Sequence, residues 1–197
     1  LVRQRPYAVS NEVEGDYAVI KIEGAAKNLL PESVDLKIAA DSGYMTAQKL
    51  GITPDITMGD FDSYKDKLPP EMNTLRVACE KDVTDTMLAC EYAKDNGCRY
   101  ITIVGGTGGR IDHSISNVFY LEDLRRQGIR VKLTDGENTV QVILDETVTV
   151  KADGGYFSIF ALDKCTVTEY GCKYPLNNAT LVRQRPYAVS NEVEGDY

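Results

Sequence analysis

The chain has 197 residues, of which 43% are hydrophobic and 26% are charged, and its net charge is -8 at neutral pH. This length allows one sizeable domain or two small ones, and the composition is that of a globular protein with no apolar run near the roughly 18 residues of a membrane span. The acidic balance and the lack of a basic cluster argue against nucleic acid as a partner, and no membrane partner is expected.

The two ends of the chain carry the same stretch. LVRQRPYAVSNEVEGDY occupies residues 1–17 and again residues 181–197. Repeat architectures show imperfect similarity at periods of about 20–50 residues, so an identical copy at both ends is more typical of a permuted or engineered chain. YAVIKIEG at residues 17–24 has the pattern of the strands near the C-terminus. Residues 1–24 are therefore assigned to the same domain as the C-terminal part.

From about residue 35 to residue 137, short apolar runs alternate with helical patterns. Strands are predicted at 34–41, 74–79 and 100–106, and helices at 46–51, 84–97 and 112–128. This alternation is typical of a parallel sheet with crossover helices. Residues 25–137 are therefore predicted to form an α/β nucleotide-binding domain.

The last of these helices shows the strongest pattern. Four apolar residues fall at i, i+4, i+7 and i+8, and these are Ile111, Ile115, Val118 and Phe119. Such spacing places them on one face, which we expect to be buried against the sheet. Gly128 follows as the predicted C-cap of the helix.

After about residue 138 the helical period vanishes. Short β-branched runs, separated by turn residues, occupy 138–144, 146–152, 155–162 and 165–171. Several such strands in succession predict an antiparallel sandwich or barrel. The fold class is thus an α/β domain followed by an antiparallel β-sandwich domain at residues 138–197, with permuted or duplicated ends.

The cysteine and histidine content restricts the chemistry. The five cysteines are odd in number and include no Cys-x-x-Cys pair, so neither a disulfide framework nor a thiolate zinc site is expected. His113 is the only histidine, which excludes a zinc site with several histidines. Reduced thiols and the lack of a signal-like start favour a cytoplasmic location.

Acidic clusters follow the predicted strand ends, where open α/β sheets bind their ligands. Asp41 ends the first strand, and Asp60 and Asp62 follow a later apolar run in GDFDS. In an extended chain the last two point to the same side. Mg²⁺ prefers one or two carboxylates together with substrate phosphates, so the pair suits a metal. A solvated turn is the alternative.

A third acidic cluster, KDVTD, lies at a predicted helix start. Asp82 or Thr84 can cap the helix, and Asp85 complements its positive end. Capping alone would explain both acids. Lys81, just before them, is not explained by capping, although a lone lysine is usually a solvated side chain.

GGTGGRIDH joins a predicted strand to a helix and fits neither the P-loop nor the GxGxxG pattern. Its glycines allow backbone N–H groups to approach an anion, and the helix N-terminus adds its dipole. Arg110 can clamp phosphate oxygens, while Asp112 can cap the helix, ligate a metal or accept a proton. His113 and Asn117 are more often structural than catalytic in such a setting.

Five separated motifs together resemble the thiamine pyrophosphokinase family over roughly residues 37–197. They are DSGY, PDITMGDFDS, KDVTDTMLACEYA, GGTGGRIDHSISN and YPLNNATL with AVSNE. The resemblance implies an α/β domain followed by a β-sandwich and a homodimer with active sites between subunits. It also implies Mg²⁺-dependent transfer of pyrophosphate from ATP to the hydroxyl of thiamine, with release of AMP.

The resemblance assigns roles by position. Metal ligands would be Asp60, Asp62 and Asp85. ATP would be bound by Asp41, Lys81, Asp82, Gly105, Gly106, Thr107, Gly108, Gly109, Arg110 and His113. The catalytic set would be Asp60, Asp62, Asp85, Arg110 and Asp112, with Asp112 near the attacking hydroxyl. Thiamine would be bound by Ser190 and Asn191 or by their copies Ser10 and Asn11, and the later copy is favoured because YPLNNAT leads into it.

The chain departs from the family pattern in three ways. Asp41-Ser42-Gly43 replaces the usual D-G-G, and no tryptophan is present to stack on thiamine. A tyrosine or phenylalanine must then supply any aromatic platform. The family's first strand, ahead of DLKIAAD, looks shortened or missing.

Two other functions are compatible with single features. A haloacid-dehalogenase-like phosphatase also begins with an apolar strand and D-x-D, and it would form a phosphoenzyme on the first aspartate. Ser63 stands where that family has a small residue before threonine or valine, and nothing in it explains GGTGGRIDH. A non-catalytic nucleotide-binding module would use the acids as caps and the glycines as a loop.

Overall fold

The computed structural model describes residues 2–4, 17–21, 34–41, 43–49, 51–61, 73–76, 83–107, 110–136, 138–148 and 156–194. The chain divides into two compact units. The α/β unit is Val13–Gly136, and the β unit combines Leu1–Glu12 with Glu137–Tyr197.

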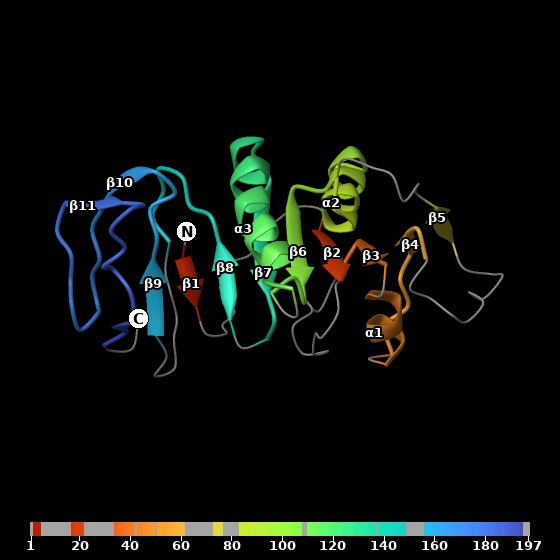
Figure 1. The fold of residues 1–197 in the computed structure, drawn as a ribbon, viewed down its shortest axis with the longest axis horizontal. Coiled ribbons are helices and arrows are strands. Elements are labelled where there is room, and N and C mark those ends of the chain that lie inside the picture. Colours follow the sequence, from red (N-terminus) through yellow and green to blue (C-terminus); the bar gives the residue numbers. More distant parts are fainter. Residues whose placement is uncertain are drawn as a thin grey trace. The chain divides into compact units, whose positions relative to one another are not determined.

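A parallel sheet forms the centre of the α/β unit (Figure 1). Its strands are β2 (Tyr17–Lys21), β3 (Leu36–Ala40), β4 (Ile56–Gly59), β5 (Thr74–Arg76), β6 (Tyr100–Val104) and β7 (Arg130–Thr134). They lie in the order β7-β6-β2-β3-β4-β5, and each neighbouring pair is parallel. All four residues of β4 are buried, as expected for a strand covered on both faces.

The order of the strands locates a switch point. From β2 the chain moves through β3 and β4 to β5, and then returns to β6 on the other side of β2. Open α/β sheets bind ligands outside the carboxyl ends of their strands at such a point. The edge formed by the ends of β2, β3, β4 and β6 is therefore the place to look for a site.

The structure corrects the assignment of residues 17–24 to the β-sandwich. Tyr17–Lys21 forms β2, which pairs in parallel with β3 and β6 inside the α/β unit. In the sequence, Ala18, Val19 and Ile20 are consecutive apolar residues, which is typical of a parallel strand covered on both faces. The first strand of the parallel sheet is therefore present, ahead of β3.

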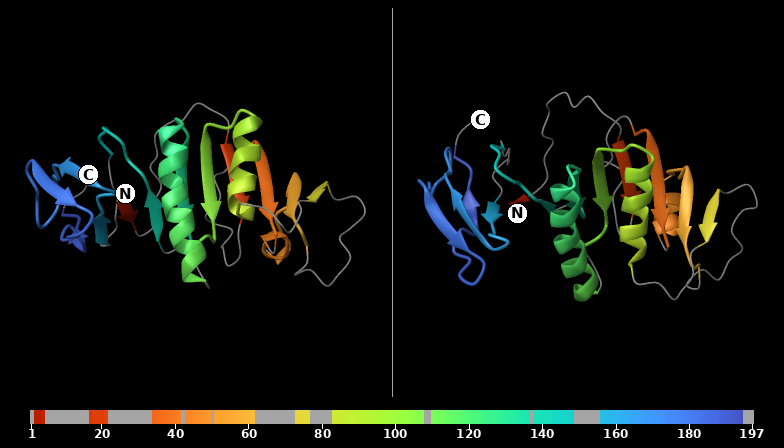
Figure 2. Two further views of the ribbon diagram at one scale, coloured as in Figure 1. Left: turned by 45° about the horizontal axis from the view of Figure 1, so that its top comes forward. Right: turned by 90° about the horizontal axis from the view of Figure 1, so that it is seen from above.

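The helices of the α/β unit are α1 (Gly43–Lys49), α2 (Asp85–Asp95) and α3 (Ile111–Arg126). The crossover from β3 through α1 to β4 runs in one direction along the sheet, whereas those through α2 and α3 run in the other. Because such crossovers are right-handed, α2 and α3 share one face and α1 covers the opposite face. Figure 2 shows α2 and α3 side by side, and the two helices are in contact.

Helix α2 begins and ends as its sequence predicts. The Thr84 hydroxyl accepts a hydrogen bond from the Met87 N–H at 3.2 Å, which makes Thr84 the N-cap. Its buried residues, Thr86, Ala89, Cys90 and Ala93, follow the i, i+3, i+4, i+7 spacing. After the last turn, Gly97 has a φ of 90°, which a residue with a side chain rarely adopts.

The predicted buried face of α3 was wrong. Ile111, Ile115 and Phe119 are 73%, 48% and 61% exposed. The helix instead buries Asn117, Tyr120, Leu121 and Leu124. Both stripes have helical spacing, so the pattern alone does not decide between them, and packing of α3 on β7 selects the second. No helix in the described ranges is both long and apolar enough to cross a bilayer.

In its described residues, the β unit contains two sets of antiparallel strands, which agrees with the predicted β-sandwich class. One has the order β12-β9-β1-β8 and comprises β1 (Val2–Gln4), β8 (Thr139–Gln141), β9 (Tyr156–Ile159) and β12 (Asn191–Glu192). The other pairs β10 (Lys164–Val167) with β11 (Ala179–Val182). A core of Phe157, Ile159, Ala161, Cys172 and Leu181 holds the unit together.

The two copies of the repeated stretch differ in structure. In the first copy, Val2–Gln4 lies as a strand between β8 and β9. In the second, Val182 ends β11, and the Arg185 N–H donates to its carbonyl in a turn at 3.1 Å. The same residues thus form a strand in one copy and a turn in the other, which shows how strongly tertiary context decides strand formation.

Candidate functional site

The loops after β3 and β4 meet at the carboxyl edge of the parallel sheet. Asp41 has a φ of 44°, and its N–H donates to the Met58 carbonyl at 2.7 Å. A Cβ atom on Gly59 would lie 3.1 Å from the Asp41 Cα, and Gly59 itself has a φ of 156°. Only glycine allows this approach. The next residue, Asp60, therefore begins its loop beside Asp41.

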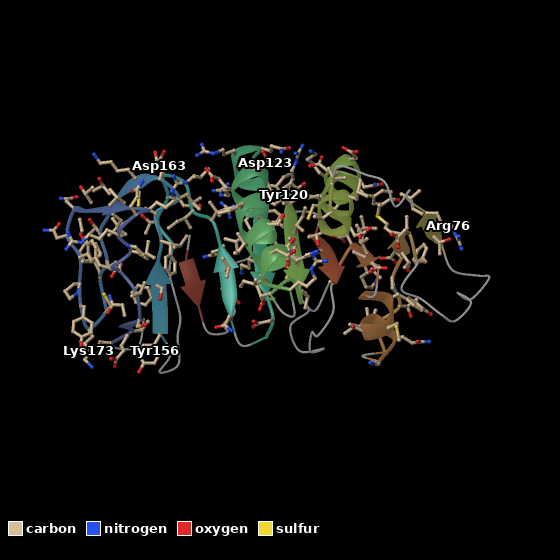
Figure 3. The ribbon with its side chains drawn as sticks, viewed as in Figure 1. Arg76, Tyr120, Asp123, Tyr156, Asp163 and Lys173 are labelled. Carbon is tan, nitrogen blue, oxygen red and sulfur yellow. The ribbon has the colours of Figure 1, made fainter. Side chains whose placement is uncertain are left out.

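A cation that the sequence analysis missed lies at the same edge. Arg76, labelled in Figure 3, is the last residue of β5. Its guanidinium carbon lies 5.9 Å from the ring centre of Phe61. Phe61 is 8% exposed and has a φ of 60°, so the residue between the two predicted metal ligands is fixed in place. The sequence gives no local signal for this contact, because Arg76 lies inside the strand predicted at 74–79 and is distant from Phe61 along the chain.

Asp85 occupies the first turn of α2, the helix that follows β5 in the order of elements. Because Thr84 supplies the cap, the cap does not require Asp85. Its carboxylate lies at the positive end of the α2 dipole, where negative charge is stabilised.

The glycine-rich loop after β6 is anchored by two neighbouring elements. Gly105 donates its N–H to the Thr134 carbonyl at 2.7 Å, and the Asn117 side-chain amide donates to the Gly106 carbonyl at 3.0 Å. A Cβ on Gly106 would lie 2.5 Å from Leu133 Cδ1, so this glycine has no room for a side chain. Asn117 is 5% exposed and is a structural residue here, as expected.

Thr107 extends this anchoring. Its hydroxyl donates to the Asp135 carboxylate at 2.8 Å, and Asp135 follows β7. The side chain of Thr107 therefore anchors the loop to the segment that follows β7. Asp135 was not recognised in the sequence, because no local pattern shows that the ends of β6 and β7 are neighbours.

Arg110 and Asp112 form an ion pair at the start of α3. Arg110 Nε and Nη2 donate to the two Asp112 carboxylate oxygens at 3.2 and 2.5 Å. The hydrogen bonds from Arg110 lower the pKa of Asp112, so this carboxyl stays ionised. Both side chains are exposed, and the N-cap residue, Arg110, makes no side-chain cap hydrogen bond. In the first turn, the His113 backbone N–H also hydrogen-bonds to the Asp112 carboxylate.

The remaining predicted residues of this edge are divided between described and undescribed parts. His113 is described and exposed in the first turn of α3. Asp62, Lys81, Asp82, Gly108 and Gly109 lie outside the described residues, as do Ser10 and Asn11. Within the described ranges, no group of three or more acidic, cysteine or histidine side chains is arranged to hold a metal ion.

In the β unit, Ser190 and Asn191 differ in their surroundings. Ser190 is exposed and has a φ of 58°, and its N–H donates to the Ser158 hydroxyl at 3.0 Å. Asn191 is 6% exposed and begins β12. The pair predicted to bind thiamine therefore presents one side chain to solvent and buries the other.

Comparison with known proteins decides the family. A family model described as the thiamin pyrophosphokinase catalytic domain matches residues 27–133, and one described as the vitamin B1 binding domain of the same enzyme matches residues 138–197. The chain belongs to the thiamine pyrophosphokinase family. The first model thus spans the parallel sheet from β3 onward with its glycine-rich loop, and the second spans β8 to β12 with Ser190 and Asn191, while β1 and β2 lie outside both.

Individual relatives agree with this thiamine pyrophosphokinase assignment. A curated thiamine pyrophosphokinase of Bacillus subtilis is 32% identical over 189 residues, with 87% of each chain covered. The solved structure of a Bacillus subtilis thiamine pyrophosphokinase has a TM-score of 0.75 at 28% identity, covering 90% of this chain and 89% of that one. A Geobacillus thermodenitrificans structure gives 0.70 at 28% identity, covering 91% and 88%.

Membership of the thiamine pyrophosphokinase family confirms three expectations from the sequence. The recognition is correct, the fold is α/β with a β-sandwich-like domain, and the protein is an enzyme of the thiamine diphosphokinase type. The two alternative functions, a non-catalytic nucleotide-binding module and a haloacid-dehalogenase-like phosphatase, are therefore excluded.

Proposed function

We propose that this enzyme transfers pyrophosphate in one step from ATP to the hydroxyl of thiamine, with Mg²⁺ as metal and AMP as the second product. The supporting observation is the contact between the loops of Asp41 and Asp60 at the same sheet edge that carries an anchored glycine-rich loop. Phosphoryl-type transfer depends mainly on positioning and charge neutralisation, and this edge offers acids for a metal and amides for phosphate.

Asp60 and Asp85 would hold the Mg²⁺, together with Asp62. The donors fit a hard cation, because carboxylate oxygens are the ligands that Mg²⁺ takes from proteins. Asp41 would support these ligands, because its backbone packs against Gly59, the residue before Asp60. When bound, the metal neutralises charge on the phosphates of ATP.

The glycine-rich loop and Arg110 would bind the triphosphate. Anchoring by Asn117 and Asp135 holds the backbone of Gly106 and Thr107 in one arrangement before a ligand arrives. Arg110 can exchange the Asp112 carboxylate for phosphate oxygens, since both present the same planar pair of acceptors. Lys81, Asp82, Gly108, Gly109 and His113 stay in the proposed ATP-binding set by position.

When Arg110 releases Asp112 to bind phosphate oxygens, Asp112 becomes available as a proton acceptor. While paired, Asp112 has a lowered pKa and is a weak proton acceptor. Loss of the Arg110 hydrogen bonds to phosphate removes the main cause of that shift. Asp112 then accepts the proton of the attacking thiamine hydroxyl only when ATP is in place.

The experiment that tests the proposed function measures products. Purified protein is incubated with ATP and Mg²⁺, with and without thiamine, and AMP, ADP and orthophosphate are quantified. Thiamine-dependent AMP in equal amount to thiamine diphosphate is expected. ADP as the nucleotide product would contradict pyrophosphate transfer, and thiamine-independent orthophosphate would indicate a hydrolase.

We further propose that the protein is a homodimer in which a second copy of the chain packs against α3. Its support is the exposed apolar stripe of Ile111, Ile115 and Phe119 beside Met87. These residues line or flank a groove of about 740 Å³ between α2 and α3 that reaches Asp112 at one end. An exposed apolar stripe next to a catalytic residue is the arrangement expected of a shared site.

Phe119→Asp is therefore expected to convert the dimer into a monomer, because the new charge cannot be buried in an apolar interface. Light scattering after size-exclusion chromatography measures the mass. The melting temperature should change little at low concentration, since Phe119 is exposed in the single chain. Lys49→Asp, on α1 at the opposite face, serves as control and should remain dimeric. An unchanged mass for Phe119→Asp would contradict the proposal.

We also propose a cytoplasmic location. Cys90, Cys165 and Cys172 support it, since they form no disulfide among the described residues and oxidising compartments favour disulfide formation. Cys79 lies outside the described residues.

A further inference from the structure

The side-chain amide of Asn191 is fully used inside the β unit. Its Oδ1 accepts the N–H groups of Tyr174 and Glu192 at 3.1 and 3.0 Å. Its Nδ2 donates to the Tyr174 carbonyl at 2.9 Å and to Glu169 Oε2 at 2.7 Å. An asparagine side chain offers two donors and two acceptors, so this amide has no capacity left for a ligand.

The orientation of this amide follows from chemistry. Two backbone N–H groups face one end, and a backbone carbonyl and a carboxylate oxygen face the other. Only the oxygen can accept from the first pair, and only the nitrogen can donate to the second. Asn191 thus acts as a clamp that holds the 171–174 segment against β12. Next to β12, the backbones of Cys172 and Val193 form an isolated antiparallel β-bridge.

Glu169 is an unusual partner for this clamp. It is 7% exposed, and burial raises the pKa of its carboxyl group. Oε2 accepts from Asn191 and from the Cys172 thiol at 3.8 Å, while Oε1 is buried with no hydrogen-bond partner in the described part of the chain. A buried carboxylate oxygen without a hydrogen-bond partner costs desolvation energy. The Oε1 atom of Glu169 therefore adds nothing to stability, and only its Oε2 atom is used in the clamp.

The clamp determines what the neighbouring residues present to solvent. Ser190 is held with its φ at 58°, in the left-handed region that is unfavourable for residues with a side chain, between the Ser158 hydroxyl and the buried Asn191. Tyr174 has both its backbone groups bonded to Asn191 and exposes 60% of its surface. A strained, exposed serine and an exposed aromatic ring are thus fixed by one buried pair.

We propose that Glu169 and Asn191 are positioning residues that hold Ser190 and Tyr174 in the geometry that binds thiamine, and that neither side chain touches the vitamin. The inference rests on the proposed function of Ser190. It changes the expected role of Asn191 from a direct contact to a support, and it adds Glu169 and Tyr174 to the vitamin-binding region.

The first test replaces Glu169 by leucine in the full chain. The KM for thiamine is expected to rise about tenfold, the effect of one lost hydrogen bond on an affinity, while kcat and the KM for ATP stay within about twofold. The melting temperature should fall only modestly, because the Asn191 Nδ2–H group loses its acceptor while the unpaired Oε1 atom is removed with the same carboxylate. Glu169→Gln keeps an acceptor for Asn191 and should restore most of the thiamine affinity.

Asp163→Asn is the matched control, since it removes an exposed carboxylate at the opposite end of the β unit from Lys173 and Tyr156 (Figure 3). It should leave every constant unchanged. An unchanged KM for thiamine in Glu169→Leu would overturn the inference. So would a fall in melting temperature with kcat and both KM values changed together, because a purely structural residue gives that result.

A second test uses the repeated stretch of the chain. Asn191→Asp places a carboxylate against Glu169 and the Tyr174 carbonyl, so thiamine binding should be lost, whereas Asn11→Asp makes the same change in the first copy and should have no effect. Equal effects of the two would overturn the inference. A wild-type protein without thiamine-dependent AMP would instead overturn the proposed function, and the inference with it.

Discussion

Asp60→Asn is expected to lower kcat for AMP formation by about a hundredfold to a thousandfold, the effect of removing one preorganised electrostatic group. The substitution keeps the size of the side chain and removes a charge beside Asp41, at the loop that Gly59 allows to approach. The apparent Mg²⁺ concentration for half-maximal activity should rise as well. Initial rates over a Mg²⁺ titration measure both quantities.

Asp55→Asn is the control for this substitution. Asp55 precedes the same strand, β4, at its amino end and accepts the Lys37 backbone N–H at 2.6 Å. The amide oxygen of asparagine can still accept this N–H, so the substitution removes only the charge paired with Lys37 and should leave the Mg²⁺ dependence unchanged. If Asp60→Asn has normal activity at every Mg²⁺ concentration, Asp60 is not a metal ligand.

Arg110→Ala is expected to reduce kcat about a thousandfold, the lower end of the range for an arginine that stabilises a transferring phosphoryl group. The melting temperature should not change, because the Arg110 and Asp112 side chains are exposed and surface ion pairs contribute little. Arg110→Lys should recover only part of the activity, since an ammonium group cannot form the planar pair of hydrogen bonds.

Arg126→Ala controls for the loss of an arginine from α3. Arg126 lies in the last turn of the helix and pairs with Glu122 at 2.6 Å, far along the helix from the sheet edge that carries Arg110. Steady-state rates with ATP and thiamine varied separately should match the unsubstituted enzyme. Normal activity in Arg110→Ala would contradict the assigned phosphate contact.

The sequence predicts most of the α/β unit because local signals and tertiary structure agree there. Thr84 was one of two N-cap candidates, and the apolar runs at β3 and β6 were predicted from nearby residues. The buried face of α3 was not, since two apolar stripes have the same period and only contact with β7 distinguishes them. β2 was misassigned because its pattern does not identify its partners.

The candidate site shows the same division. Acids and glycines at strand ends are visible in the sequence, because open sheets bind ligands there. The residues that hold the site in place are not visible in the sequence. Asp135, which accepts the Thr107 hydrogen bond, follows a different strand, and Glu169 and Asn191, which are hydrogen-bonded, are 22 positions apart. The repeated stretch makes the limit plain, because identical residues form β1 in one copy and the end of β11 in the other.

The most direct test of the central claim follows the β-phosphate of ATP. The enzyme is supplied with Mg²⁺, thiamine and ATP labelled at the β-phosphorus, and the products are separated. Pyrophosphate transfer predicts that the label leaves the nucleotide and appears in thiamine diphosphate, with unlabelled AMP. Label that stays in a nucleotide, or that appears in orthophosphate or pyrophosphate without thiamine, would contradict the account.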